Sequence, residues 1–109
     1  MKGKIVLVPF PFTDLTAAKL RPALVLFEGD RDVVVAFISS KISDMPMLGS
    51  VVIGDEHPEF ELTGLKVDSA IRLDKVATVL KELVVGEIGE VGDDLKRVIN
   101  EKMLEIYAL

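Results

Sequence analysis

Two arginines are the side chains of this sequence best suited to phosphate chemistry. Arg21 comes directly before Pro22 and opens an apolar segment, and Arg72 stands between two apolar residues, two positions before Asp74. A guanidinium presents a fork of donors that matches phosphate oxygens, and a carboxylate on the same strand face can hold that fork in place. Arg21 could equally be a solvated strand end, and the Arg–Asp pair a structural ion pair.

The hydroxyl and imidazole groups of this sequence give weaker evidence of a functional site. Ser39 and Ser40 end an apolar segment, where a hydroxyl could donate to a phosphate or simply mark the end of a strand. His57, the only histidine, stands among acidic residues and predicts a solvated loop. The sequence has no cysteine, no zinc-ligand spacing, no phosphate-binding glycine loop and no nucleophile elbow. We therefore expect no metal, no cofactor and no thiol nucleophile.

Short β-branched segments bounded by turn residues predict a mainly β fold. The predicted strands are residues 4–9, 22–27, 32–40, 50–53, 69–80 and 84–91. A Glu-Gly-Asp turn at residues 28–30 closes the second and third strands into a hairpin. Proline-bearing polar segments predict loops over residues 10–20, 41–48 and 55–64. An apolar stripe of helical period predicts one helix, capped by Asp93 or Asp94 and ending near Tyr107.

The alternation of side chains predicts two architectural features. In the third strand both faces are apolar, so both need cover from a closed barrel, a packed helix or a partner subunit. In the stretch 69–80 the apolar parity changes near Asp74, which predicts a bulge or bend beside a functional site.

Length and charge limit the possible functions. A chain of 109 residues, half of them hydrophobic, predicts a single domain over residues 1–109. The net charge of −5, from 18 acidic and 13 basic residues, argues against phosphate binding unless the basic side chains cluster. No targeting segment is visible and no apolar run is long enough to cross a bilayer, so we expect a cytoplasmic protein.

Taken in order, these segments resemble the MazF/PemK family of toxins. The segments that carry the resemblance are Gly3-Lys4-Ile5-Val6-Leu7-Val8-Pro9-Phe10 with Thr13-Asp14, Arg21-Pro22-Ala23-Leu24-Val25-Leu26, Ala36-Phe37-Ile38-Ser39-Ser40, and Ile71-Arg72-Leu73-Asp74 followed by Thr78. They occur in the family's order and cover nearly the whole chain.

The resemblance implies an SH3-like β-barrel with a C-terminal helix. It also implies a homodimeric, metal-independent endoribonuclease (mRNA interferase) of a type II toxin–antitoxin system. Such a toxin cleaves single-stranded RNA through 2′-hydroxyl attack and is neutralised by a cognate antitoxin. By match to the family motifs, the catalytic residues would be Arg21, Ser39, Arg72 and Asp74. The substrate-binding residues would be Thr13, Lys19, Ser40, Lys41 and Thr78.

Two departures from the family pattern keep alternatives open. Residues 10–20 contain no histidine, which some members use, and Ala77 precedes Thr78 where the family has an arginine. With the acidic charge, these departures suggest a catalytically inactive dimeric module that binds a peptide or protein partner. A third reading keeps the barrel but makes it a gyrase-poisoning toxin, although the segments around Arg21 and Arg72 match the RNA-cleaving branch better.

Overall fold

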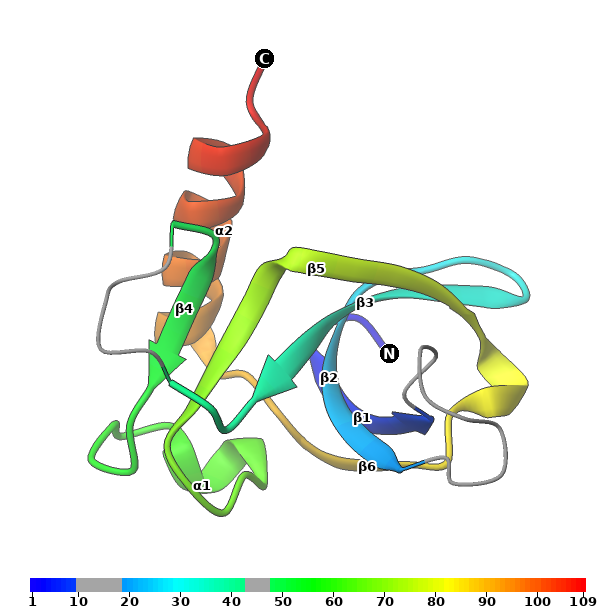
Figure 1. Cartoon of the computed structure of the whole chain (residues 1–109), viewed down its shortest axis with the longest axis horizontal. Coiled ribbons are helices and arrows are strands. Elements are labelled where there is room, and N and C mark those ends of the chain that lie inside the picture. Colours follow the sequence, from blue (N-terminus) through cyan, green and yellow to red (C-terminus); the bar gives the residue numbers. More distant parts are fainter. Residues whose placement is uncertain (10–18, 43–47) are drawn as a thin grey trace.

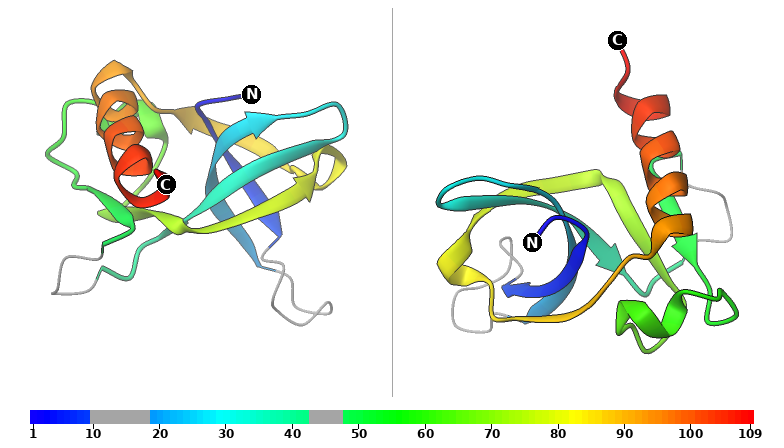
Figure 2. Two further views of the ribbon diagram at one scale, coloured as in Figure 1. Left: turned by 90° about the horizontal axis from the view of Figure 1, so that it is seen from above. Right: turned by 180° about the vertical axis from the view of Figure 1, so that it is seen from behind.

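The computed structural model describes residues 1–9, 19–42 and 48–109, in which six strands form one antiparallel sheet. The strand order is β4-β5-β3-β2-β1-β6. The elements are β1 (Lys4–Pro9), β2 (Leu20–Glu28), β3 (Asp32–Ser39), β4 (Ser50–Ile53), α1 (Phe60–Thr63), β5 (Ser69–Leu80), η2 (Lys81–Leu83), β6 (Gly86–Glu90) and α2 (Asp93–Tyr107). The sheet curls into an open half-barrel, and α2 stands outside the curl on the side of β4 (Figures 1 and 2). The predicted fold class is confirmed.

The two faces of the sheet build two separate cores, because successive side chains of a strand point to opposite faces. The helix-side core consists of Ile5, Leu24, Ala36, Ile38, Val51, Ile53, Phe60, Leu65, Ile71, Leu73, Val91, Leu95 and Ile99. The strand-side core consists of Val6, Val8, Ala23, Val25, Val33, Val35, Phe37 and Val79. Cover on both faces, predicted from the apolar third strand, is therefore confirmed: α1 and α2 cover one face, and the curl of the sheet encloses the other.

The predicted irregularity in β5 is a bulge. Ala36 of β3 pairs with Val76, but the next residue, Phe37, pairs with Arg72. Residues 73–75 therefore have no partner in β3. A bulge of this kind bends the strand and re-aims the side chains around it.

Two contacts from outside the β3–β5 ladder hold the bulge. The Asp74 N–H donates to the carbonyl of Gly49 over 3.2 Å, and the hydroxyl of Tyr107 in α2 donates to the carbonyl of Leu73. A Cβ on Gly49 would lie 2.6 Å from the Cβ of Asp74, so this close approach requires glycine. The end of α2 is thus tied to the strand that carries Arg72.

The segment 55–64, predicted to be an exposed loop, contains the short helix α1 instead. Phe60 and Thr63 of α1 are buried, and Leu65 directly after it joins the helix-side core. The prediction was wrong because the apolar residues of this segment are too few and too scattered to show a period, and only tertiary packing makes them part of the core.

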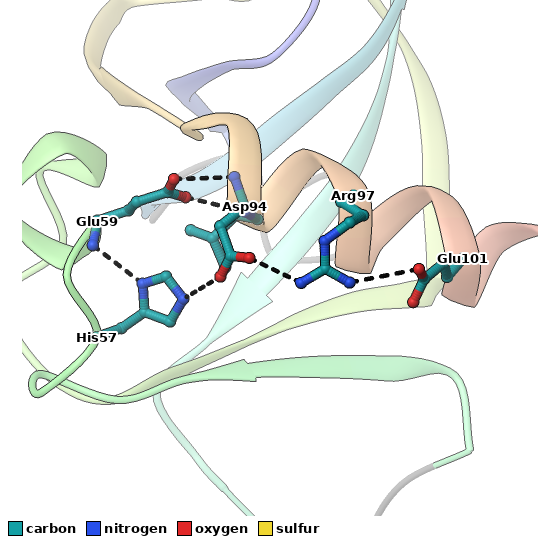
Figure 3. Close-up of polar contacts among 6 residues, drawn as sticks. His57, Glu59, Asp94, Arg97 and Glu101 are labelled. Atoms are coloured by element: carbon teal, nitrogen blue, oxygen red, sulfur yellow. Dashed lines mark hydrogen bonds and ion pairs between the residues drawn. The ribbon is translucent and has the colours of Figure 1, made fainter.

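The cap of α2 was also predicted wrongly, although the helix itself is present and ends at Tyr107 as expected. The N-cap residue is Gly92, and neither aspartate side chain caps the helix. Glu59 does so from the segment before α1: its carboxylate accepts the N–H groups of Asp94 and Leu95, both over 2.9 Å (Figure 3). A cap that comes from 35 residues away leaves no local signal in the sequence.

Among the described residues, no helix is long and apolar enough to cross a membrane.

Candidate functional site

Three adjacent strands bring polar side chains to one end of the strand-side face. Ala23 of β2 and Phe37 of β3 are paired and both belong to the strand-side core. Arg21 is two residues before Ala23 and Ser39 is two residues after Phe37, so both lie on the same face as this pair. Arg72 of β5 joins them because it pairs with Phe37 on the other side of β3. At this end of the strand-side face, two guanidinium groups and a hydroxyl therefore replace the apolar side chains of the core.

These side chains line one depression of about 220 Å³, which we call the basic groove. Its lining residues are Arg21, Phe37, Ile38, Ser39, Ser40, Lys41, Arg72 and Lys75. Four of them carry a positive charge, and no carboxylate belongs to the described lining. A protein with a net charge of −5 thus concentrates cations at one site, which is the arrangement that phosphate binding requires.

Asp74 does not line the groove but is hydrogen-bonded to Arg72, which does. The Nε of Arg72 donates to Oδ1 of Asp74 over 2.9 Å and its Nη2 donates to Oδ2 over 2.8 Å, so the pair is bidentate. The hydrogen bonds from Arg72 hold the pKa of the Asp74 carboxyl below its usual range, and those same bonds raise the pKa of Arg72. The Arg72 side chain is 17% exposed and that of Asp74 41%, so the carboxylate supports the arginine from the solvent side.

Ser39 has a defined hydroxyl orientation. Its Oγ accepts the backbone N–H of Lys41 over 3.1 Å. Since one hydroxyl can accept and donate at once, the hydrogen of Ser39 is available to an anion in the groove. Ser40 and Lys41, which follow β3, are exposed at the same rim.

Besides Asp74, two described residues of the predicted set do not line the basic groove. Lys19 is exposed immediately before β2 and Thr78 is exposed opposite Val34, farther along β5. Thr13 lies outside the described residues. The structure therefore brings together Arg21, Ser39, Ser40, Lys41 and Arg72, with Asp74 attached to Arg72.

Lys75 lines the basic groove but was missed by sequence reasoning. In a regular strand it shares the parity of Ile71 and Leu73, which point into the helix-side core. The bulge at residues 73–75 reverses that parity and brings Lys75 to the side of Arg72. The change of parity near Asp74 was the signal, but it does not specify which side chain turns.

His57 lies in a turn, as predicted, but its side chain is half-buried and has a structural role. Its Nδ1 accepts the N–H of Glu59 over 3.0 Å, and its Nε2 lies 3.2 Å from Oδ2 of Asp94 (Figure 3). Asp94 in turn contacts Arg97 over 2.7 Å. The acidic segment around His57 thus stabilises the start of α2 and contributes no residue to the basic groove. In the part of the chain that the structure describes, no group of three His, Cys, Asp or Glu side chains is arranged so that it could hold a metal ion.

Comparison with known proteins places this geometry in context. A family model described as "PemK-like, MazF-like toxin of type II toxin-antitoxin system" matches residues 1–107. The Mycobacterium tuberculosis toxin MazF-mt6 is similar in structure, with a TM-score of 0.75 and 18% identity over 97% of both chains. An endoribonuclease from a mycobacterial species, solved in complex with its cognate antitoxin, has a TM-score of 0.71 and 16% identity, covering 100% of this chain and 95% of its own. No curated protein sequence matches this chain.

Proposed function

We propose, from the premise that this chain belongs to the PemK-like, MazF-like toxin family of type II toxin–antitoxin systems, that it is a metal-independent endoribonuclease for single-stranded RNA. The observation that carries the proposal is the basic groove, in which Arg21, Ser39 and Arg72 surround one cavity of about 220 Å³. The family is known for endoribonucleases, and the two arginines stand at the positions of this sequence that match its motifs.

The groove suits cleavage by the RNA's own 2′-hydroxyl. The 2′ oxygen forms a bond to phosphorus while the bond from phosphorus to the 5′ oxygen breaks. The products are a 2′,3′-cyclic phosphate and a 5′-hydroxyl. Negative charge accumulates on the non-bridging oxygens in the transition state, where fixed cations are most effective. Arg21 and Arg72 supply that stabilisation, and the Ser39 hydroxyl donates a hydrogen bond to the phosphate.

The same geometry supports an assignment of the two proton transfers. Arginine holds its protons too firmly to be a good acid, so a groove lysine, Lys41 or Lys75, is the better donor to the leaving 5′ oxygen. Asp74 is a poor base because both its oxygens accept from Arg72 and its pKa is lowered. Its role in this proposal is to position Arg72, and the proton of the 2′-hydroxyl passes to water.

The remaining predicted residues extend the substrate path. Ser40 at the rim of the groove and Lys19 at the start of β2 would contact the RNA on either side of the cleaved linkage. Thr13 and Thr78 stay as sequence predictions. The groove gives them no support, since Thr78 lies away from it and Thr13 is outside the described residues.

The family also supports proposals for partners. We infer a homodimer that acts on mRNA in the cytoplasm and is neutralised by a cognate antitoxin. One similar structure is described as an endoribonuclease in complex with its cognate antitoxin, which supports an antitoxin here. An acidic antitoxin segment would complement the charge of the basic groove and exclude RNA from it.

The test is cleavage of a long single-stranded RNA in EDTA by the wild type and by Arg21→Ala. We expect discrete fragments with 2′,3′-cyclic phosphate ends and a loss of at least a hundredfold in the variant, because one fixed transition-state donor is worth roughly that much. Arg31→Ala, in the exposed β2–β3 turn, is the matched control and should cleave normally. Intact RNA with the wild type, or cleavage that is independent of Arg21, would exclude the proposal.

A non-catalytic interaction module is the second candidate, and one observation favours it. Asp74 neutralises Arg72 with two hydrogen bonds, and Ala77 stands where the family has an arginine, so the groove holds fewer uncompensated charges. This candidate predicts tight binding of a peptide partner by a protein that leaves RNA intact. Cleavage that depends on Arg21 and Arg72 would exclude it.

A further inference from the structure

A second depression adjoins the basic groove. We call it the apolar recess, and it has a volume of about 230 Å³. Arg21, Ile38 and Ser40 line both depressions, so the two depressions meet at the start of β2 and the end of β3. The recess lies on the helix-side face of the sheet, since Ile38 belongs to that core. A ligand held in the basic groove can therefore extend over the strand ends into the recess.

The walls of the recess are mostly apolar. They are formed by Leu7, Pro22, Ile38, Leu65, Val67 and Ile88. Val67 is 55% exposed, so its side chain is accessible to a ligand in the recess. Such walls suit the face of a flat ring better than an ion or an extended polar chain.

The floor of the recess is closely packed. Gly64 has a left-handed conformation (φ 74°), and a Cβ there would come within 2.1 Å of the Ile88 carbonyl oxygen. The segment after α1 therefore packs directly on the backbone of β6. Ser69 is buried, and its hydroxyl donates to the carbonyl of Val67 over 2.8 Å. This hydrogen bond holds residues 67–69, which form the adjoining part of the wall.

The polar groups at the rim are cationic or hydroxylic. Lys66 and Arg21 contribute donors and Ser40 a hydroxyl, while no carboxylate belongs to the described lining. An ammonium group donates only, so Lys66 favours a ring edge that presents acceptor oxygens. Uracil and guanine present carbonyl oxygens, whereas adenine has none and presents an amino donor beside its acceptor ring nitrogens.

We propose that the apolar recess binds one base of the RNA, the base next to the phosphodiester in the basic groove, and that Lys66 selects uracil or guanine over adenine there. This inference rests on the proposed function. Bases of single-stranded RNA are free to splay out of the chain, and proteins read them by apolar contact with the ring and hydrogen bonds to its edge. Lys66 is a specificity residue in this assignment and does not touch the reacting atoms.

The experiment uses short oligonucleotides that are 2′-deoxy throughout except for one ribonucleotide, so that only one linkage can be cleaved. The base on each side of that linkage is varied in turn. With the wild type we expect faster cleavage for uracil or guanine than for adenine on one side. Lys66→Met should reduce this preference about tenfold and change cleavage of the adenine substrate less than twofold. Lys66 is exposed, so the variant should fold.

Lys102→Met is the matched control, because Lys102 lies on α2 and pairs with Glu105 over 3.4 Å, away from both depressions. Its base preference should equal that of the wild type. The inference is overturned if Lys66→Met keeps the full preference or slows all substrates equally.

A binding measurement separates this inference from the proposed function. Fully 2′-deoxy oligonucleotides cannot be cleaved, and their affinities by fluorescence anisotropy should show the same preference and the same loss in Lys66→Met. Lost preference in binding, with no cleavage of any ribonucleotide, would reject the nuclease and keep the base site. Cleavage that depends on Arg21, with a preference that is insensitive to Lys66, would keep the nuclease and reject the base site.

Discussion

At the scale of single residues, the pair of Arg72 and Asp74 gives the groove its most defined geometry. Both oxygens of Asp74 are used by Arg72, so the guanidinium is held in one plane and keeps its remaining N–H groups for a ligand. This arrangement favours electrostatic stabilisation over proton transfer by the carboxylate, because a carboxylate with a lowered pKa is a weak base.

Asp74→Asn tests that role. We expect RNA cleavage to fall about tenfold through kcat, because Arg72 loses its orientation, and the pH–rate profile to keep its shape, because no base is removed. A variant whose profile loses its acidic limb would show instead that Asp74 is the base. Asp30→Asn, in the exposed β2–β3 turn, is the control for a changed surface charge.

The same variant has a pH signature in stability. The folded pKa of Asp74 lies below its ordinary value of 3.8, so the ionised pair stabilises the fold above that pH. This contribution is lost as the pH falls through the folded pKa. In urea denaturation the wild type should therefore exceed Asp74→Asn in stability at pH 7, and the difference should shrink as the pH falls below 3.8. Solvent screens this half-exposed pair, so the difference is expected to be small.

At the scale of elements, α2 links two distant parts of the chain. Glu59 caps its first turn, and its last turn contacts the bulge in β5. Glu59 accepts two backbone N–H groups at the start of the helix, and the hydroxyl of Tyr107 reaches the carbonyl of Leu73 at the other end. The strand that carries Arg72 thus depends on a helix whose first turn is held by a distant segment.

Glu59→Ala removes the cap of α2. We expect a loss of about 1–2 kcal/mol in the free energy of unfolding, because two backbone donors at the helix start lose a charged acceptor. Glu61→Ala is the matched control: Glu61 is an exposed neighbour on α1, no described hydrogen bond involves its side chain, and stability should barely change. Urea denaturation measures both, and equal stabilities would show that water replaces the cap at no cost.

At the scale of the whole molecule, an acidic protein presents a basic groove in the part of the chain that the structure describes. The net charge is −5, yet Arg21, Lys41, Arg72 and Lys75 converge on a single groove. The acidic segment around His57 is used for the start of α2 and does not face the groove. Local clustering therefore resolves the conflict between the total charge and a phosphate ligand.

This clustering predicts a salt-dependent affinity for RNA. Lys75→Ala should weaken binding of a fully 2′-deoxy oligonucleotide and reduce the slope of log K against log salt by about 0.7, the value for one phosphate contact on a single strand. Lys102→Ala on α2 should leave the slope unchanged. A Lys75→Ala slope equal to that of the wild type would place the phosphate elsewhere.

The sequence by itself determined the local parts of this protein. Strand alternation, the Glu28-Gly29-Asp30 turn and the stripe after Asp93 are encoded by neighbouring residues, so the strands, the hairpin and α2 were predictable. The motif residues Arg21, Ser39 and Arg72 were also recognisable, because the resemblance to the family rests on short segments.

Only the tertiary structure decided the features that join distant segments. The bulge turned Lys75 to the basic groove, Glu59 capped a helix 35 residues away, and Phe60 became part of the core. The apolar recess likewise combines β1, β2, β3, β6 and the segment after α1. Side-chain periodicity reports only which face of its own element a residue occupies. Which faces and ends meet is set by how the sheet curls and packs, and no local pattern records that.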